Sequence, residues 1–319
     1  MASPALSVVV PVYNEEAGLA ALFARLYPAL DALKVAYEVI FVNDGSRDRS
    51  AALLEEQQRA RPDVTRVILF NANYGQHLAI IAGFAHVRGA RVVTLDADLQ
   101  NPPEEIAGLL AAMDAGHDYV GGVRRTREDA WWRRVASRAM NQLRERITRI
   151  KMTDQGCMLR AYSSDIAAAI ADGPEVSTFI PALAFTFAHN PAEVEVAHEE
   201  RAAGESKYSL YQLIRLNFDL ITGFSLVPLQ IFSMFGMIVS AGALATYLGV
   251  IVFRLFSGEW HQALSALWDR DLLAFFLIGM VLFGLGVVGE YVGRIYQQVR
   301  ARPRYTIRAI LESPSNDLP

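Results

Sequence analysis

The sequence predicts an α/β domain with a doubly wound, mostly parallel sheet, followed by two transmembrane helices. Three observations lead to this prediction. Short apolar runs alternate with helical patterns up to about residue 210, which is typical of strands and crossover helices in a parallel sheet. Beyond that point, two long runs contain no charged residue. The 319-residue chain is 52% apolar and has a mean hydropathy of +0.20, which is unusual for a purely soluble enzyme.

Each predicted strand is a short apolar run, as expected where helices cover both faces of a sheet. The five predicted strands are residues 6–12, 37–42, 64–70, 91–95 and 119–123. The helical segments between them are residues 15–33, 47–60, 75–88 and 103–115. In such sheets ligands bind at the carboxyl ends of the strands, so the residues at these ends are the first candidates for a functional site.

Three of the predicted strands end in polar residues. The first ends in PVYNEE, the second in VNDGSRD and the fourth in DADLQ. The polar side chains at these ends belong to Tyr13, Asn14, Glu15, Asn43, Asp44, Ser46, Asp96, Asp98 and Gln100. Any one of these ends could simply cap a helix or form a turn. Three of them on one edge of a sheet favour a ligand-binding site.

The chemistry of these residues favours a nucleotide whose phosphates bind through a metal ion. The sequence contains neither of the two common glycine-rich phosphate loops. Asp96 and Asp98 offer hard oxygen ligands, which suit Mg²⁺ or Mn²⁺ better than zinc. Asp44 could accept the N–H group of a pyrimidine base, and Tyr13 could stack on that base.

The two charge-free runs predict two membrane-spanning helices. Residues 220–253 and 272–289 contain no Asp, Glu, Lys or Arg, and the first run exceeds the roughly 20 apolar residues that span a bilayer. We place the spans at 229–253 and 272–293. A pair of buried core helices is the weaker alternative, because a soluble core rarely contains so long an uncharged run. Several arginines follow the second span, which puts both termini in the cytoplasm.

Four parts of the chain are expected from these patterns. They are a cytoplasmic α/β domain (1–206), a juxtamembrane segment (207–226), a membrane hairpin (227–293) and a basic cytoplasmic tail (294–319). The juxtamembrane segment has apolar residues at helical spacing, which suits either an amphipathic helix in the membrane interface or a helix packed on the soluble domain. The tail alternates like a strand near 304–310 and could extend the sheet of a neighbouring chain.

Charge and cysteine content exclude two classes of protein. The formal net charge is −4, so the chain has no global basic field for nucleic acid. Cys157 is the only cysteine, which excludes an internal disulfide framework and fits a reducing compartment.

Six sequence motifs resemble those of a known enzyme family. They are VVVPVYNEE, NDGS, NYGQHLAIIAGF, LDADLQNPPEEI, TDQGCMLRAY and GESKYS. Together they resemble the polyprenyl-phosphate glycosyltransferases of glycosyltransferase family 2, which have the GT-A fold. The resemblance runs from about residue 6 to residue 306. It is strongest to the branch that transfers 4-deoxy-4-formamido-L-arabinose to undecaprenyl phosphate in lipid A modification.

The resemblance implies a UDP-sugar donor and a divalent metal ion, Mg²⁺ or Mn²⁺. The residues that match nucleotide-binding positions of the family are Pro11, Tyr13, Glu15, Asp44 and Asp96. The residues that match the metal and diphosphate site are Asp96, Asp98 and Gln100. Asn43 departs from the family pattern, since many relatives have a second Asp at that position.

The resemblance also implies that the acceptor is undecaprenyl phosphate in a lipid bilayer. The candidate residues for binding its phosphate are Arg124, Arg201, Ser206 and Lys207. Asp98 and Asp154 are the catalytic candidates. Asp154 matches a proposed catalytic base, but a phosphate monoester is largely dianionic at neutral pH. Asp154 could therefore orient the phosphate or stabilise positive charge on the sugar instead, in a single displacement with inversion.

The implied location is the inner membrane of a bacterium, where related proteins form tetramers, so we expect a homo-oligomer. Two alternatives stay open. The same fold could transfer glucose or mannose from another nucleotide donor, because the segments that contact the sugar cannot be interpreted chemically. The second alternative is from a different class: the chain could be a non-catalytic membrane subunit that binds a nucleotide sugar. The presence of all four candidate residues Asp96, Asp98, Asp154 and Lys207 argues against it.

Overall fold

The computed structural model contains two compact units. One comprises residues 1–208 together with 302–319, and the other comprises residues 209–301. The structure describes residues 4–124, 152–154, 156–173, 179–199, 270–299 and 303–313, and separate positions at 229–230, 232, 234–236, 238–239, 242, 245 and 256.

The first unit is built on an eight-stranded sheet, counted over the described residues, with the strand order β7-β5-β6-β4-β1-β2-β3-β8. The strands are β1 Leu6–Val12, β2 Tyr37–Asn43, β3 Thr65–Phe70, β4 Arg91–Thr94, β5 Tyr119–Arg124, β6 Arg160–Ser163, β7 Pro191–Val196 and β8 Ile307–Leu311. Strands β6 and β8 run antiparallel to their neighbours, and the other pairs are parallel. The prediction of a mostly parallel sheet is therefore confirmed.

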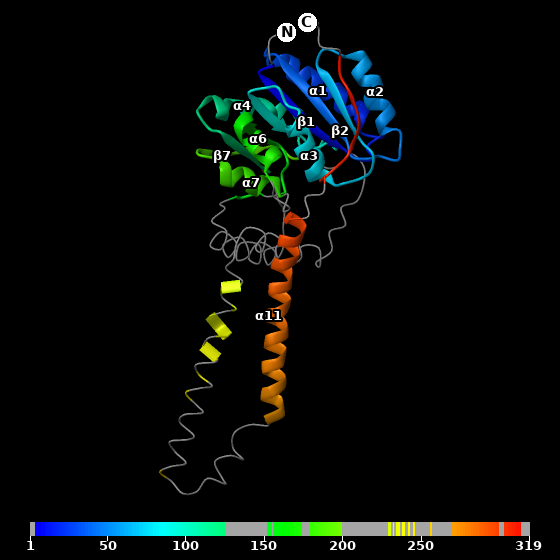
Figure 1. Ribbon diagram of the computed structural model, residues 1–319. Coiled ribbons are helices and arrows are strands. Elements are labelled where there is room, and N and C mark those ends of the chain that lie inside the picture. Colours follow the sequence, from blue (N-terminus) through cyan, green and yellow to red (C-terminus); the bar gives the residue numbers. More distant parts are fainter. Residues whose placement is uncertain are drawn as a thin grey trace. The chain divides into compact units, whose positions relative to one another are not determined.

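Helices cover the sheet (Figure 1). They are α1 Leu19–Ala32, α2 Ser50–Ala60, α3 Gln76–Phe84, η1 Pro103–Glu105, α4 Ile106–Asp114, α6 Ser164–Asp172 and α7 Ile180–Phe187. The five predicted strands and the four predicted helical segments all occur, and their bounds agree to within a few residues. The first three helices begin one to four residues later than predicted, because the residues after β1, β2 and β3 form loops.

Both faces of strand β1 are buried. Val8 and Val10 belong to the core that contains residues of α1, α2 and α4. Val9 points to the other face, where α3 packs: a Cβ atom on Gly83 would lie 2.3 Å from Cγ1 of Val9. Only glycine allows α3 to approach the sheet this closely. Each buried valine contributes about 1.5–3 kcal/mol through loss of water contact, so β1 is held firmly where its carboxyl end meets the candidate site.

The C-terminal strand β8 extends the chain's own sheet. It pairs antiparallel with β3, for example Val67 with Leu311, and is drawn in red in Figure 1. Glu312 follows it and receives hydrogen bonds from Arg66 at 2.8 Å and from Arg88 at 2.9 Å. The tail therefore forms a strand near the predicted position, and it pairs with β3 of the same chain. Its pairing with a neighbouring chain stays a prediction.

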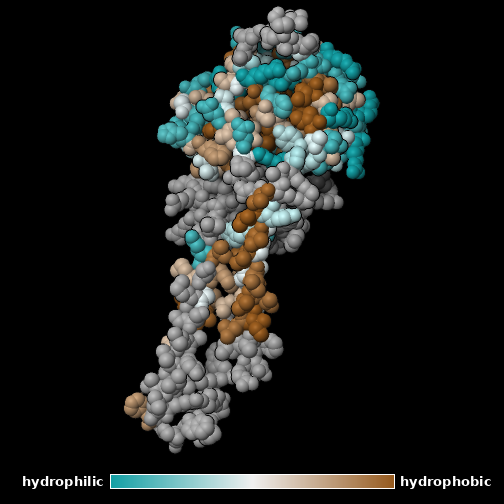
Figure 2. Space-filling model, in the orientation of Figure 1, coloured by the Kyte–Doolittle hydropathy of each residue, from teal (hydrophilic) through white to brown (hydrophobic). Residues whose placement is uncertain are grey.

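The second unit contains α11, Arg270–Val299, a helix of 30 residues. Between Leu277 and Val299 it exposes many of its described apolar side chains, which Figure 2 shows in brown. Phe283 packs on Phe232 with 5.7 Å between ring centroids, and a Cβ atom on Gly284 would collide with Phe232. A small residue at Gly284 therefore permits close packing between these segments.

Within the part of the chain that the structure describes, no helix is both long and apolar enough to cross a membrane. The predicted juxtamembrane segment, 207–226, lies outside the described residues. The first predicted span, 229–253, is described only at separate positions. The membrane hairpin stays a prediction.

Candidate active site

A pocket of about 390 Å³ lies at the carboxyl ends of the central strands. It is lined by Pro11, Val12, Tyr13, Glu15, Asp44, Asn73, Gly75, Gln76, Asp96, Ala97 and Asp98. Pro11 and Val12 are the last two residues of β1, and the others follow β1, β2, β3 or β4. In the sheet, β2 lies on one side of β1 and β4 lies on the other, so the strand order reverses at β1. Open α/β sheets bind ligands at such a reversal. The volume falls in the range of small-molecule sites.

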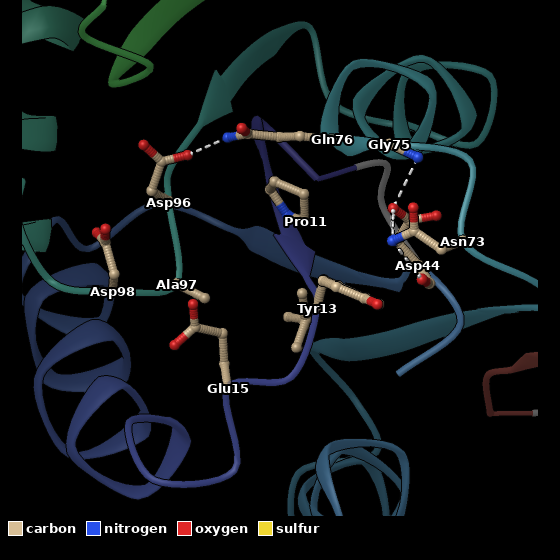
Figure 3. Close-up of a pocket in the computed structure, with 11 residues that line it drawn as sticks. Pro11, Tyr13, Glu15, Asp44, Asn73, Gly75, Gln76, Asp96, Ala97 and Asp98 are labelled. Carbon is tan, nitrogen blue, oxygen red and sulfur yellow. Dashed lines mark hydrogen bonds between the residues drawn. The ribbon is translucent and has the colours of Figure 1, made fainter. Parts of the chain in front are cut away.

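The pocket has two polar sides (Figure 3). Asp96 and Asp98 lie on one side, and Asp44 lies with Asn73 and Gly75 on the other. Pro11 and Tyr13 lie between them. Tyr13 is 43% exposed, which suits a residue that stacks on a planar ligand.

Asp44 is held by the loop that follows β3. Its carboxylate accepts hydrogen bonds from the backbone N–H groups of Tyr74 (2.7 Å) and Gly75 (2.8 Å) and from Nδ2 of Asn73 (2.9 Å). Gly75 has a φ of +98°, which favours glycine. Burial raises the pKa of Asp44, and the two backbone hydrogen bonds partly offset this effect. Since a carboxylate has about four acceptor positions, about one is left for a ligand.

Neighbouring side chains and backbone groups orient the two aspartates on the other side of the pocket. Gln76 donates from Nε2 to Oδ1 of Asp96 at 2.6 Å. The backbone N–H group of Gln100 donates to Oδ1 of Asp98 at 3.1 Å. Gln100 itself is not among the residues that line the pocket.

Asp96 and Asp98 fit a hard divalent ion. Among the described residues, no group of three or more His, Cys, Asp or Glu side chains could hold a metal ion by itself. A nucleotide-bound Mg²⁺ ion needs less, because one or two carboxylates complete a shell made largely of phosphate oxygens and water. The two aspartates in the pocket supply that number.

Asn14 and Ser46, which the sequence placed beside the ligand, connect two loops instead. The N–H group of Asn14 donates to Oγ of Ser46 at 3.0 Å, and Oδ1 of Asn14 accepts from the N–H group of Arg47 at 2.9 Å. Ser50 accepts from the N–H group of Glu15 at 2.9 Å. These bonds fix the loop after β1 to the loop after β2, so the side chains of Tyr13 and Glu15 are held in the pocket.

Asp154 forms a nearly buried ion pair with Arg124. Arg124 binds both carboxylate oxygens, with Nε–Oδ2 2.6 Å and Nη2–Oδ1 2.8 Å, and the N–H group of Gly156 donates to Oδ1 at 3.0 Å. Burial would raise the pKa of Asp154, but the hydrogen bonds and charge of Arg124 outweigh it and the pKa lies below its usual value. A Cβ atom on Gly156 would lie 2.8 Å from Nη2 of Arg124, so glycine leaves room for the pair.

Arg160 was not singled out from the sequence, although it is a charged residue inside the apolar stretch GCMLRAY. It is 1% exposed. Its guanidinium donates to the carbonyl oxygens of Cys157 (2.7 Å) and Asp154 (2.6 Å) and to the hydroxyl of Tyr119. Arg160 therefore fixes the backbone of the segment that carries Asp154.

The structure brings together six of the predicted site residues in the pocket, namely Pro11, Tyr13, Glu15, Asp44, Asp96 and Asp98. Arg124 and Asp154 pair with each other but do not line this pocket. Arg201, Ser206 and Lys207 lie outside the described residues. Asn73, Gly75 and Gln76 belong to the family motif NYGQHLAIIAGF, but the sequence analysis assigned none of them a role of its own in the site.

Residues 7–170 match the family model described as Glycosyl transferase family 2. This chain belongs to glycosyl transferase family 2. As a member of that family it is a glycosyltransferase, and the prediction of an enzyme of this class is confirmed. The curated relatives of this family 2 member include an undecaprenyl-phosphate 4-deoxy-4-formamido-L-arabinose transferase from Edwardsiella ictaluri (strain 93-146). That protein is 46% identical over 313 residues, which cover 98% of this chain and 96% of the relative.

Two solved structures share the fold of this glycosyltransferase. Glucosyl-3-phosphoglycerate synthase from Mycobacterium tuberculosis, in complex with Mn²⁺, UDP-glucose and phosphoglyceric acid, is 19% identical with a TM-score of 0.50, over 69% of this chain and 78% of that one. Mannosyl-3-phosphoglycerate synthase from Rubrobacter xylanophilus is 14% identical with a TM-score of 0.50, over 69% of this chain and 72% of that one. The predicted GT-A-like α/β fold is confirmed.

Proposed function

We propose that this glycosyltransferase moves 4-deoxy-4-formamido-L-arabinose from a UDP-sugar to undecaprenyl phosphate at the cytoplasmic face of a bacterial inner membrane. The observation that carries this proposal is the 46% identity to the Edwardsiella transferase, which extends over nearly the whole of both chains. The shared sequence therefore includes the C-terminal third, where the membrane contacts of such an enzyme would lie, as well as the family domain.

The donor's uridine would bind on the Asp44 side of the pocket. Tyr13 offers an exposed ring for stacking, and Asp44 has about one acceptor position left for the N–H group of the base. Pro11 and Glu15, which also line the pocket, are the other proposed nucleotide contacts. The hydrogen bonds from Asn73, Tyr74 and Gly75 keep the Asp44 carboxylate in place before the nucleotide arrives.

Asp96 and Asp98 would hold the divalent ion together with the donor diphosphate, and Gln100 is a further candidate ligand. When bound, the ion would neutralise charge on the diphosphate of the departing UDP. Gln76 keeps the Asp96 carboxylate oriented toward the pocket, and the backbone of Gln100 does the same for Asp98. Such preorganised charges lower the barrier because they need not rearrange during the reaction.

The acceptor phosphate would attack the sugar directly. A bond forms between a phosphate oxygen of the lipid and the anomeric carbon, the bond from that carbon to the UDP oxygen breaks, and the configuration inverts. Since the phosphate is largely dianionic at neutral pH, no proton need be removed from it. Asp154 has a lowered pKa and is a poor proton acceptor, which favours an orienting or electrostatic role over that of a base.

Arg124, Arg201, Ser206 and Lys207 are the proposed contacts of the acceptor phosphate. Arg124 already binds Asp154 through two hydrogen bonds, so the phosphate would have to share this guanidinium with the carboxylate. The lipid would be presented by the membrane hairpin, 229–253 and 272–293, whose charge-free sequence and exposed apolar side chains on α11 support a membrane location. We also propose a homo-oligomer.

The test is a transferase assay with the purified full-length chain in detergent, undecaprenyl phosphate and Mn²⁺ or Mg²⁺. UDP-4-deoxy-4-formamido-L-arabinose, UDP-glucose and GDP-mannose are offered separately, and the lipid product is identified by mass spectrometry. We expect the formamido-arabinosyl lipid, and its loss in Asp98→Ala and on addition of a chelator. A hexosyl lipid would replace the proposed sugar by glucose or mannose. The absence of any product despite UDP binding would contradict the proposed activity.

A further inference from the structure

A second pocket, of about 360 Å³, lies beside the donor pocket at the ends of β2 and β3. It is lined by Asn43, Gly45, Ser46, Arg47, Ala51, Phe70, Asn71, Ala72, Asn73 and Arg308. Asn73 lines both pockets. The proposed transfer reaction assigns no role to this second pocket.

Two loops and the C-terminal strand build the pocket. Gly45 has a φ of +66°, and a Cβ atom there would lie 2.4 Å from the carbonyl carbon of Ala72. The loops after β2 and β3 therefore touch at a point that only glycine permits. Arg308 comes from β8, which pairs with β3 and so reaches this edge of the sheet.

The pocket presents hydrogen-bond donors. Arg47 and Arg308 are exposed, and within the described residues neither guanidinium takes part in a hydrogen bond or ion pair. The side-chain oxygen of Asn43 accepts from the N–H group of Ser46 at 3.2 Å, and that of Asn71 accepts from the hydroxyl of Tyr74 at 2.7 Å. These bonds use the amide oxygens and leave the amide NH₂ groups, which can only donate.

No carboxylate is among the described residues that line the pocket. The carboxylates of the two aspartates nearest in sequence, Asp44 and Asp48, accept hydrogen bonds from groups outside the pocket or from backbone N–H groups. Asp44 accepts hydrogen bonds from the loop after β3, and Asp48 accepts from the N–H groups of Ser50 and Glu16. Ala51 belongs to the first turn of α2, where the helix dipole adds partial positive charge. The site is therefore positive in a chain whose net charge is −4.

We propose that this second pocket binds a phosphate-bearing anion, separately from the donor nucleotide. Two guanidinium groups and two amide groups match phosphate oxygens in charge and in hydrogen-bonding capacity, and arginine suits phosphate because its planar fork donates two parallel bonds. The phosphate comes either from a soluble phosphorylated compound or from the headgroup of an anionic lipid, and the two sources share this chemistry.

The experiment uses the full-length chain in detergent at low ionic strength, with the donor pocket saturated by UDP and Mg²⁺. Inorganic phosphate is titrated, and its binding is followed by ³¹P NMR line broadening. The double variant Arg47→Gln, Arg308→Gln removes both guanidinium groups. We expect phosphate to bind the double variant at least about tenfold more weakly, since each charge-assisted hydrogen bond lost is worth that much or more. The two single variants should fall between.

The matched control is the double variant Arg49→Gln, Arg59→Gln, which removes the same charge from residues that do not line the pocket. It should bind phosphate as the unaltered chain does. Equal weakening in both double variants would show a general charge effect and overturn the proposal, as would phosphate binding that UDP abolishes, or no phosphate binding to the unaltered chain. Thermal unfolding of each variant checks that it folds.

A second titration distinguishes the two sources of phosphate. Dihexanoyl phosphatidylglycerol is added below its micellar concentration in competition with inorganic phosphate. If the lipid displaces phosphate from the unaltered chain but not from the double variant, the pocket binds a lipid headgroup. If the lipid does not displace phosphate that is bound to the unaltered chain, the pocket binds soluble phosphates. Displacement that persists in the double variant would place the lipid, and the phosphate with it, at another site.

Discussion

Asp44 and Asp154 are both nearly buried carboxylates, 2% and 8% exposed, yet their surroundings change their pKa values in opposite directions. Asp44 accepts hydrogen bonds from uncharged groups of the loop after β3, namely two backbone N–H groups and an amide, and its burial raises the pKa. Asp154 is buried against Arg124, which lowers the pKa. The charge of the hydrogen-bonding partner, rather than burial, therefore decides whether the pKa of a buried carboxylate rises or falls.

The largest expected effect comes from Asp154→Asn, which removes the charge while keeping the shape. If Asp154 acts electrostatically on the sugar or the acceptor, turnover should fall about 100-fold or more, while UDP affinity stays unchanged because Asp154 does not line the donor pocket. Steady-state assays and UDP titration measure the two quantities. Normal turnover in this variant would remove Asp154 from the mechanism.

The next largest effect tests the ion pair itself. Arg124→Gln leaves the Asp154 carboxylate without a cation, and breaking a buried pair in this way costs about 3 kcal/mol of unfolding free energy. Thermal or chemical unfolding in detergent measures the loss. Adding Asp154→Asn to this variant should restore part of it, because no charge is then left unpaired. If the double variant were no more stable than Arg124→Gln, the pair would not be what stabilises this region.

Asp44→Asn should weaken UDP binding about tenfold, which is 1.4 kcal/mol. In this variant the NH₂ group of the new asparagine would replace a carboxylate oxygen that accepts hydrogen bonds. Because an NH₂ group can only donate, the bonds from Asn73 and Gly75 that hold residue 44 would be disturbed. Asp63→Asn, on an exposed residue outside the pocket, is the matched control and should bind UDP normally. Unchanged UDP affinity in Asp44→Asn would place the base elsewhere.

The smallest effect is a difference in pH dependence. The lowered pKa of Asp154 means that its contribution to stability is present above its unfolded pKa and is lost as the pH falls through the folded one. The raised pKa of Asp44 means that its contribution is present below its unfolded pKa and is lost as the pH rises through the folded one. Unfolding measured between pH 7 and the lowest pH at which the chain stays folded should therefore show opposite trends for Asp154→Asn and Asp44→Asn, each relative to the unaltered chain. Parallel trends would contradict the assigned directions.

The central strands could be predicted from the sequence because they are buried on both faces and so read as continuous apolar runs. Strand β7 was missed because Pro191–Val196 alternates polar and apolar residues and is only partly buried. Strand β6 was missed because it has four residues and begins with Arg160. A strand that contains a buried charge has no simple signal in the sequence.

The site was predictable where a strand end carried a carboxylate. Asn73, Gly75 and Gln76 follow β3, which ends without one, so nothing in that stretch indicated their hydrogen bonds to Asp44 and Asp96. The pairing of Arg124 with Asp154 joins residues 30 positions apart and depends on how β5 lies beside the loop before β6. Sequence spacing does not encode a contact of that kind.

Strand β8 makes the second unit an insertion between two parts of one sheet. Residues 209–301 leave the first unit and the chain then returns to it, where β8 pairs with β3 and Glu312 binds Arg66 and Arg88. A chain cut once within the insertion would thus yield two fragments that share a sheet. We expect the halves of such a split enzyme to copurify, and Glu312→Ala to weaken their association. A truncation before β8 would uncover the apolar edge of β3, a surface that invites aggregation.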